Sequence, residues 1–500
     1  MPLPPSRSTS VRGWLRQPAG PAALRSIPGL LAGPSQFRTR LLVLGLSVSL
    51  CLASPAGGQE PTAPIEQRVE RLEEQVENLR QQLDAGPDSA QLAEIRLQIE
   101  AITREIETLR LGEEIAAKAD TSGFGLGPAA SKVYRAGQGV SIGGYGEFLY
   151  QNFAPEQQDG SPSDSPDQVD ALRAVFYFGY KFDDHFLFNS EVEFEHASTS
   201  ESGSVAVEFA YLDWRFRGLQ GSTGMRAGLV LLPMGFINEL HEPPTYLGTL
   251  RPETERRIIP TTWRELGLGL FGAAGEFDWR VFVVNGLDAV GEGPDGGGFS
   301  SAGLRAGRQK GSKALAEDFA VVGRMDWIGV PGLLVGGSGY YGGSGQGAED
   351  PLAPGETIKA ATLIMEGHAA YRVRGFDLRG MVALSTVGDV VSLNAAKGLT
   401  GAESIGERLT GWYLQAGYDV LRETRTNVRL LPYVRYESID TQDAVPEGFE
   451  SNPATDRDLF TLGAQVLPIP NIAAKVDYTF QSNAARSGVD QLNVSLSYMF

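Results

Sequence analysis

The chain has 500 residues, of which 42% are hydrophobic, and a formal net charge of −18 at pH 7. So acidic a chain is a poor partner for nucleic acid, because nucleic-acid phosphates require a basic protein surface. It contains 62 glycines and no stretch near the roughly 20 apolar residues that a membrane-spanning helix needs, so it is typical neither of a disordered chain nor of a helical membrane protein.

Residues 1–58 are predicted to be a secretory signal peptide, with an apolar core from Leu41 to Ala53. The arginine-rich residues 1–36 precede this core and are either an extended n-region or the product of a start codon assigned too early. Small residues follow the core, and cleavage after Ala56 or after Gly58 would suit them equally. Removal of the signal peptide takes away six arginines and no acid, which moves the net charge to −24.

Residues 59–118 are predicted to form a periplasmic coiled coil. Apolar residues recur at steps of four and three in two sets, which are Ile65, Val69, Leu72, Val76, Leu79 and Leu83, and Leu92, Ile95, Ile99, Ile102, Ile106 and Leu109. Residues 85–88 interrupt the pattern. Each half is marginal alone, so its apolar seam requires a partner, either the same segment of sister subunits or the other half folded back as a hairpin. Isoleucine at both core positions favours three strands, and a surface helix packed on its own domain is the alternative.

Residues 119–138 are rich in Gly, Ala and Ser and are predicted to be a linker. The rest of the chain, residues 139–500, is predicted to contain only strands and loops. Sixteen strand-like runs begin near Val140, Val169, Phe186, Val205, Gly224, Trp263, Glu276, Asp318, Leu333, Thr357, Phe376, Arg408, Thr426, Arg457, Ile472 and Asp490.

The connections between these runs alternate in length. Most odd-to-even connections are long, and they span residues 154–168, 233–262, 287–317, 344–356, 389–407 and 440–456. Most even-to-odd connections are short, and they span residues 183–185, 217–223, 274–275, 330–332, 374–375 and 468–471. This alternation indicates an up-and-down outer-membrane barrel with short periplasmic turns and long external loops.

Apolar and polar residues alternate along individual strands. The polar set of residues 189–195 is Asn189, Glu191, Glu193 and Glu195, and it alternates with Phe188, Val192 and Phe194. The same holds for residues 428–437 and 472–481. These patterns predict a polar lumen face and an apolar outer face, whereas the loops of a soluble β-sandwich would not sort by parity.

The last run, Gln491 to Phe500, keeps period two to its final aromatic residue. We expect this strand to pair with the first one and to place Phe500 at the periplasmic lipid interface, where it would serve membrane assembly. About sixteen strands are enough to enclose a water-filled passage, and water would then solvate charged residues at strand centres without buried partners. The predicted fold is therefore a 16-stranded antiparallel transmembrane β-barrel preceded by a coiled coil, and the predicted function is a passive aqueous channel.

The third external connection contains the most specific motifs: the turn Pro233-Met-Gly-Phe236, which follows the stretch Arg226 to Leu229, and a charged segment from Arg251 to Glu265. Here the chain resembles trimeric outer-membrane porins, most nearly the phosphate-selective porin O and P family. The resemblance covers roughly residues 140–500. It implies sixteen strands, a homotrimer and a loop folded into the pore as its constriction, together with diffusion of small hydrophilic or charged solutes.

Substrate choice does not follow from the resemblance, because lysine is scarce here and the lumen faces mix signs. The predicted constriction residues are the cations Arg251, Arg256, Arg257 and Arg264 and the counter-charges Glu239, Glu242, Glu253, Glu255 and Glu265. The predicted pore-lining residues are Glu191, Glu193, Glu195, Arg173, Arg226, Arg372, Arg379, Arg429 and Arg435. A basic wall opposite an acidic one would create a transverse field that orients polar solutes. The alternative is that these charges line the lumen without selecting anything.

Nothing in the sequence indicates catalysis, a metal or a cofactor. The four histidines are His185, His196, His241 and His368, and they lack the spacing of metal ligands. The glycine-rich residues 291–311 are expected to be a mobile external loop. Two other classes remain as alternatives: an outer-membrane enzyme on a barrel, and an envelope tether in which the coiled coil binds the cell wall or a periplasmic partner.

Overall fold

The computed structural model describes residues 74–75, 126–198, 203–218, 222–293, 297–424 and 426–500. All of them belong to one of the chain's two compact units, Pro64–Phe500. The predicted signal peptide and, apart from Glu74 and Gln75, the predicted coiled coil lie outside the described residues. None of the helices found within the described residues is long and apolar enough to cross a membrane.

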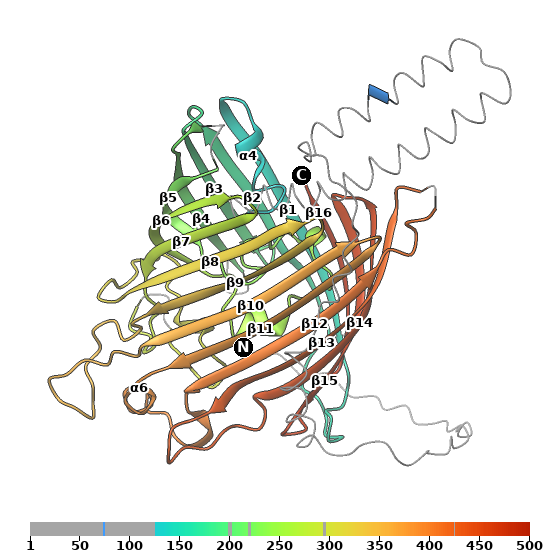
Figure 1. Cartoon of the computed structure of the whole chain (residues 1–500). Helices are drawn as coiled ribbons and strands as arrows, with labels where there is room; N and C mark the ends of the chain where they lie inside the picture. The colour runs from blue at the N-terminus through green and yellow to red at the C-terminus, as the bar shows by residue number, and fades with distance from the viewer. Residues whose placement is uncertain (1–73, 76–125, 199–202, 219–221, 294–296, 425) are drawn as a thin grey trace, which may run out of the picture. The chain divides into compact units, whose positions relative to one another are not determined.

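Sixteen strands in the described part of the chain form a closed antiparallel barrel (Figure 1). Each strand pairs with its neighbours in the sequence, and β1 pairs with β16. The strands are β1 (Gly139–Phe153), β2 (Gln168–Lys181), β3 (Phe186–Glu195), β4 (Ser204–Arg215), β5 (Gly224–Leu231), β6 (Arg264–Ala274), β7 (Phe277–Asn285), β8 (Phe319–Val330), β9 (Leu333–Gly342), β10 (Thr362–Val373), β11 (Phe376–Val387), β12 (Arg408–Tyr418), β13 (Arg429–Ala444), β14 (Asp456–Ile469), β15 (Ile472–Asn483) and β16 (Gln491–Met499).

Short helices interrupt the connections, which corrects the expectation of strands and loops alone. They are η3 (Pro243–Thr245), α5 (Glu253–Arg257), η4 (Arg305–Gly307), α6 (Val390–Lys397) and η5 (Gly401–Glu403), and a further helix, α4 (Lys132–Arg135), precedes β1 in the predicted linker. The longest, α6, buries Val390 and Leu393 and ends at Gly398, whose left-handed backbone lets the chain turn away. These helices are too short to produce a clear helical period in the sequence.

The predicted strand starts agree with the structure to within three residues except at β10. That strand begins at Thr362 and not near Thr357, because Thr357 forms an isolated bridge with Glu349 inside the preceding connection. The alternation of connection lengths is also present. Two of the short turns, Pro331-Gly332 and Arg374-Gly375, place glycine at a positive φ, the backbone conformation that tight hairpins require.

The barrel wall has one apolar face and one polar face. Along β15, Ile472, Val476 and Phe480 are exposed, whereas Lys475 and Asp477 are buried inside. The other strands alternate in a similar way, and large apolar side chains are exposed on every strand from β1 to β16 except β5. A continuous apolar exterior on a closed barrel is the surface that hydrocarbon solvates.

The barrel closes where Phe500 follows β16. Its backbone N–H donates to the carbonyl of Gly144 at 2.9 Å, and the Gly144 N–H donates to the Phe500 carbonyl at 3.0 Å. The Phe500 ring lies edge-on to Phe176, and a Cβ atom at Gly144 would stand 2.8 Å from the ring. The glycine therefore leaves room for the terminal aromatic residue at the seam.

We predict that a chain ending at Met499 closes less stably and reaches the membrane less efficiently. It loses two backbone hydrogen bonds at the seam, each worth about 1 kcal/mol, together with the ring contacts. The temperature at which the folded band converts to the unfolded band in gel electrophoresis, and the yield of folded protein in membranes, measure the effect. Phe500→Tyr keeps the hydrogen bonds and should resemble the parent chain; equal behaviour of the shortened chain would contradict the prediction.

Candidate functional site

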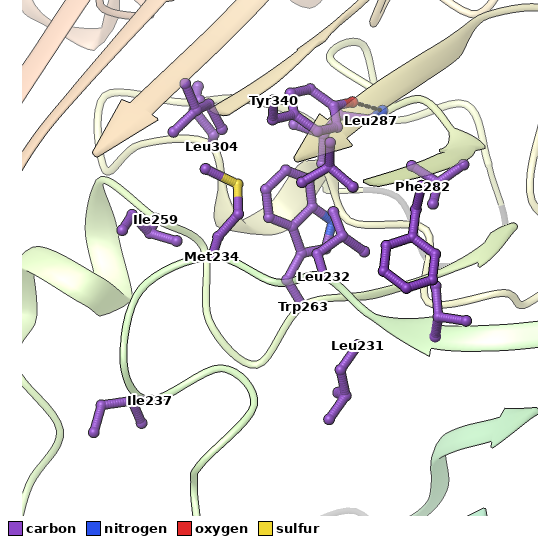
Figure 2. Close-up of a cluster of buried hydrophobic side chains, with 14 of the residues drawn as sticks. Leu231, Leu232, Met234, Ile237, Ile259, Trp263, Phe282, Leu287, Leu304 and Tyr340 are labelled. Carbon is purple, nitrogen blue, oxygen red and sulfur yellow. Dashed lines mark hydrogen bonds between the residues drawn. The ribbon is translucent and has the colours of Figure 1, made fainter. Parts of the chain in front are cut away.

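The segment between β5 and β6, residues 232–263, lies inside the barrel; we call it the inner loop. Leu232, Met234 and Trp263 are fully buried, and Figure 2 shows them together with Leu304 and Tyr340, which come from elements farther along the chain. The ring centroids of Trp263 and Tyr340 are 4.7 Å apart. This apolar cluster fixes both ends of the inner loop against the wall formed by β7 to β9.

Asn238 closes the base of the inner loop. Its amide nitrogen donates to the carbonyls of Leu232, at 2.7 Å, and Trp263, at 2.8 Å, and its amide oxygen accepts the Trp263 N–H at 2.6 Å. One buried side chain thus joins the residue that leaves β5 to the residue that enters β6. The polypeptide between them is directed into the barrel as a closed loop.

The far side of the inner loop is held by β15. Lys475 donates to the carbonyl oxygens of Pro243, Tyr246 and Gly248 at 2.7, 2.9 and 2.8 Å. The carboxylate of Asp477 accepts the backbone N–H of Thr249 at 2.7 Å. The inner loop therefore crosses the interior from the β5–β6 wall to β15.

The returning half of the inner loop contains α5 and is fixed by carboxylates. Glu255 accepts the N–H of Ile237, at 2.7 Å, and the hydroxyl of Tyr413, at 2.8 Å. Glu437 of β13 accepts the N–H of Thr254 at 3.2 Å. Burial raises the pKa of Glu255, whereas these hydrogen bonds lower it.

Several predicted constriction residues have structural contacts. Glu239 pairs with Arg280, at 2.5 Å, and Glu255 bonds within the loop and to β12. Arg264, the first residue of β6, pairs with Glu208 at 2.7 Å. Glu265 accepts hydrogen bonds from the side chains of Trp263, Asn285 and the backbone of Gln309. These groups hold the inner loop and its neighbours in place, and little of them is exposed.

Glu242 is buried and accepts hydrogen bonds from the backbone of Ala129 and Ala130. The remaining constriction residues lie in a partly exposed cluster around Glu253. Its carboxylate pairs with Arg256 at 2.8 Å and Arg257 at 2.9 Å, and Arg457 of β14 is 3.6 Å away. The side chains of Arg256 and Arg257 are 48% and 26% exposed. Burial alone would raise the pKa of Glu253, but the three guanidinium groups lower it to about 2.

Two arginines of the connection between β7 and β8 extend this cluster. Burial lowers the pKa of Arg305, and so do the charges of Arg308, Arg256, Arg251 and Arg257, so each of these four guanidinium groups lies close enough to repel Arg305. Arg308 also lies near the carboxylates of Glu208 and Glu265. The Nη1 atom of Arg305 and the Nε and Nη2 atoms of Arg251 are buried without a hydrogen-bond partner among the described residues. We define the arginine cluster as Arg251, Arg256, Arg257, Arg305, Arg308 and Arg457.

The sequence did not reveal Arg305, Arg308 and Arg457 as members of this site. The first two lie in the glycine-rich stretch that we expected to be a mobile external loop, yet Phe299 and Leu304 of that stretch are fully buried. The two closely spaced charges Arg305 and Arg308 were the only feature of the sequence that could have indicated a site there. No local pattern connects them with the inner loop, which lies about fifty residues earlier in the chain.

The predicted pore-lining residues face the barrel interior, but most are paired there. The pairs are Glu191 with His241, Arg173 with Glu193, Arg226 with Asp213, Arg379 with Asp377, Arg429 with Asp419 and Arg435 with Glu437, while Arg372 also bonds Asp377 and Glu195 accepts from Ser204. This corrects the expectation that water alone solvates charges at strand centres. The inner loop fills much of the interior, so a buried charge there requires a partner.

The four histidines form no common site. His185 lies in the turn after β2, His196 pairs with Asp170, His241 pairs with Glu191, and His368 lies between Asp326 and Glu366. Within the described residues no group of three or more His, Cys, Asp or Glu side chains is arranged to hold a metal ion.

The fold and site together define a closed 16-stranded barrel with a loop folded into its interior. No known family model matches the chain. The chain is 37% identical over 384 residues to an uncharacterized protein of Aquifex aeolicus (strain VF5). The matched region covers 75% of this chain and 83% of that protein. The chain belongs to the same family as that protein.

Several solved outer-membrane structures are also similar to this chain. One is OmpF of Salmonella typhi in complex with daunomycin, which is 12% identical over 72% of this chain and 97% of that one, with a TM-score of 0.47. Another is the outer membrane channel DcaP of Acinetobacter baumannii, which is 10% identical over 72% of this chain and 97% of that one, with a TM-score of 0.45. The anion-selective porin from Comamonas acidovorans is 12% identical over 72% of this chain and 99% of that one, with a TM-score of 0.42. At these identities and TM-scores the likeness does not assign a function to this chain.

We predict that Lys475→Met loosens the inner loop. The substitution removes a charged donor from three buried carbonyl oxygens, which should lower the free energy of unfolding by about 3 kcal/mol. Trypsin should then cleave the folded protein faster after Arg256 and Arg257. Lys359→Met removes an exposed lysine and serves as the matched control; cleavage at the same rate in both variants would show that Lys475 does not hold the loop.

Proposed function

We propose that this protein is a porin of the bacterial outer membrane, a water-filled channel through which small hydrophilic or charged solutes diffuse. The observation that carries the proposal is the combination of a continuous apolar exterior with a polar segment folded inside a closed barrel. An apolar exterior suits lipid, and closure leaves no strand edge unpaired there. Sixteen strands are wide enough to enclose a passage as well as a loop.

The inner loop is proposed to be the constriction. It crosses the interior from the β5–β6 wall to β15, so a solute that passes through the barrel has to pass beside it. Its exposed side chains would then decide which solutes pass. Most of its acidic residues are already bound to backbone or wall groups, which leaves Glu253 as the carboxylate beside the arginine cluster.

We propose further that the channel prefers anions. Three guanidinium groups surround Glu253, and the charges of Arg251, Arg256, Arg257 and Arg308 act on Arg305. Arg305 and Arg251 present buried N–H groups without a partner among the described residues. An anionic solute would relieve the repulsion between these groups and accept their hydrogen bonds. A homotrimer, with the N-terminal region in the periplasm, belongs to the same proposal and is its expected assembly.

Planar-bilayer recording of the purified protein in a salt gradient tests the proposed function. A conducting pore should give stepwise openings, in groups of three for a trimer, with a reversal potential on the anion-selective side. A membrane that stays silent when folded protein has been inserted would overturn the porin assignment.

We predict that Arg256→Glu combined with Arg257→Glu moves the reversal potential toward cation preference. The double variant replaces two partly exposed positive charges of the arginine cluster by negative ones, which repel anions in the constriction. Arg422→Glu changes the charge of an exposed arginine in the connection between β12 and β13 and should leave the reversal potential unchanged. No difference between the double variant and this control would remove the inner loop from the selective region.

We predict the opposite effect for Glu253→Gln, which removes the carboxylate that pairs with Arg256, Arg257 and Arg457. Anion preference should increase at neutral pH. Because the pKa of Glu253 is about 2, the parent carboxylate is fully charged at this pH, so the substitution removes a whole negative charge. A reversal potential that is the same in the variant and the parent would contradict the prediction.

A further inference from the structure

Residues 126–136, which precede β1, lie against the inner wall of the barrel with most of their side chains buried; we call them the strap. Leu126, Ala129 and Val133 are 1%, 3% and 1% exposed. Residues 119–138 were expected to be a linker, and from Leu126 on the structure packs this stretch against the inner faces of β1, β2 and β3 through α4. In Figure 1, α4 lies beside these three strands.

Two glycines of the wall, Gly143 and Gly179, allow the strap to approach the wall closely. A Cβ atom at Gly179 of β2 would stand 2.6 Å from Cγ2 of Val133, and one at Gly143 of β1 would stand 2.8 Å from the carbonyl oxygen of Ala129. Any other residue at these positions would push the strap away from the wall. The close approach of the strap is therefore built into the sequence of β1 and β2.

The strap is bound to the inner loop through Glu242. The carboxylate of Glu242 accepts the backbone N–H groups of Ala129 and Ala130, each at 3.0 Å. A Cβ atom at Gly127 would stand 2.5 Å from the Glu242 carboxyl carbon, so the two segments touch directly. The strap thus lies between the inner loop and the wall made by β1 to β3.

Charged wall residues hold the other end of the strap. The hydroxyl of Tyr134 donates to Asp213 at 2.7 Å and accepts from Arg226 at 2.8 Å. The amide of Asn189 donates to the Ala130 carbonyl at 2.9 Å. All three wall residues are buried beneath the strap.

These contacts allow the strap to leave without breaking the barrel. The strap pairs with the wall and the inner loop through side chains of those elements, and the ladder between β1 and β2 runs from Gly139 onward and does not include it. The strap also belongs to the main cluster of buried hydrophobic residues, through Leu126 and Val133, so the seated position is the stable one. Its departure would also uncover the charged groups Glu242, Asp213 and Arg226, which water in a widened passage would solvate.

We propose that the strap is an internal gate, which narrows the passage beside the inner loop when seated and widens it when withdrawn toward the N-terminal region. The proposal rests on the proposed channel function. It assigns a conformational role to the segment that joins the barrel to the N-terminal region. Glu242 couples the position of the strap directly to the inner loop, because this carboxylate belongs to the inner loop and binds the strap.

A reversible lock tests whether the strap moves. The test uses the full chain with Cys51→Ser, to which Val133→Cys and Gly179→Cys are added. Val133 Cβ and an added Cβ at Gly179 stand 2.7 Å apart, so a separation larger by about 1 Å permits a disulfide. The oxidised protein should show only the low-conductance level in a planar bilayer. Reduction should restore the higher level seen in the parent.

A release variant tests the opposite direction. Val133→Asp places an unpaired carboxylate at a fully buried position of the strap and leaves every strand unchanged, so the strap should withdraw and the single-channel conductance should rise. Gln138→Asp adds the same charge at an exposed position nearby and should conduct like the parent. Heat-modifiable mobility in gels verifies that all variants are folded barrels.

The outcomes separate the two proposals. Higher conductance of Val133→Asp, with loss of the higher level in the oxidised cysteine pair, supports the gate. Equal conductance of the parent, the release variant and the locked protein overturns the gate and leaves the channel intact. Silence of every folded variant, including Val133→Asp, overturns the channel and the gate with it.

Discussion

The structure depends on how the inner loop satisfies its backbone inside a barrel. Residues 232–263 contain only two short helical turns, so most of their carbonyl oxygens have no partner within the loop. The wall supplies donors: Lys475 binds three carbonyls, and Arg379 binds that of Thr245 at 3.0 Å. Arg324 binds the carbonyl of Gly235. A buried carbonyl without a partner would cost free energy, so these cations are part of the fold.

This use of cations divides the charges of the interior into two groups. Wall cations that bond to the loop's backbone are also paired with wall carboxylates, as Arg379 is with Asp377, so little of their charge reaches a solute. The arginine cluster differs, because the three arginines around Glu253 outnumber that carboxylate and because Arg256 and Arg257 are partly exposed. The excess charge that could act on a passing ion is therefore concentrated at the loop's charged segment and is not spread over opposite walls.

The sequence predicted the barrel well because period-two alternation and turn length are local properties. The facing of Glu191 or Lys475 follows from its immediate neighbours, and fifteen of the sixteen strand starts lie within three residues of those expected. The site was predicted only in part. Arg256, Arg257 and Glu253 belong to one charged stretch, but their association with Arg305 and Arg457 depends on contacts between distant parts of the chain. The ion pairs of the wall could not be predicted for the same reason. A charged wall residue requires a partner only because the inner loop excludes water from the interior.

Glu242 shows how these contacts combine. The sequence placed it among the constriction charges, yet in the structure its carboxylate accepts two backbone N–H groups of the strap and is 1% exposed. Burial raises the pKa of Glu242, and the two N–H groups oppose that effect by favouring the charged form. Withdrawal of the strap would remove both N–H donors at once and would leave a carboxylate of the inner loop in contact with water. A movement that begins next to β1 would therefore change the charge exposed by the inner loop as well as the width of the passage, and size selection and ion preference would respond together.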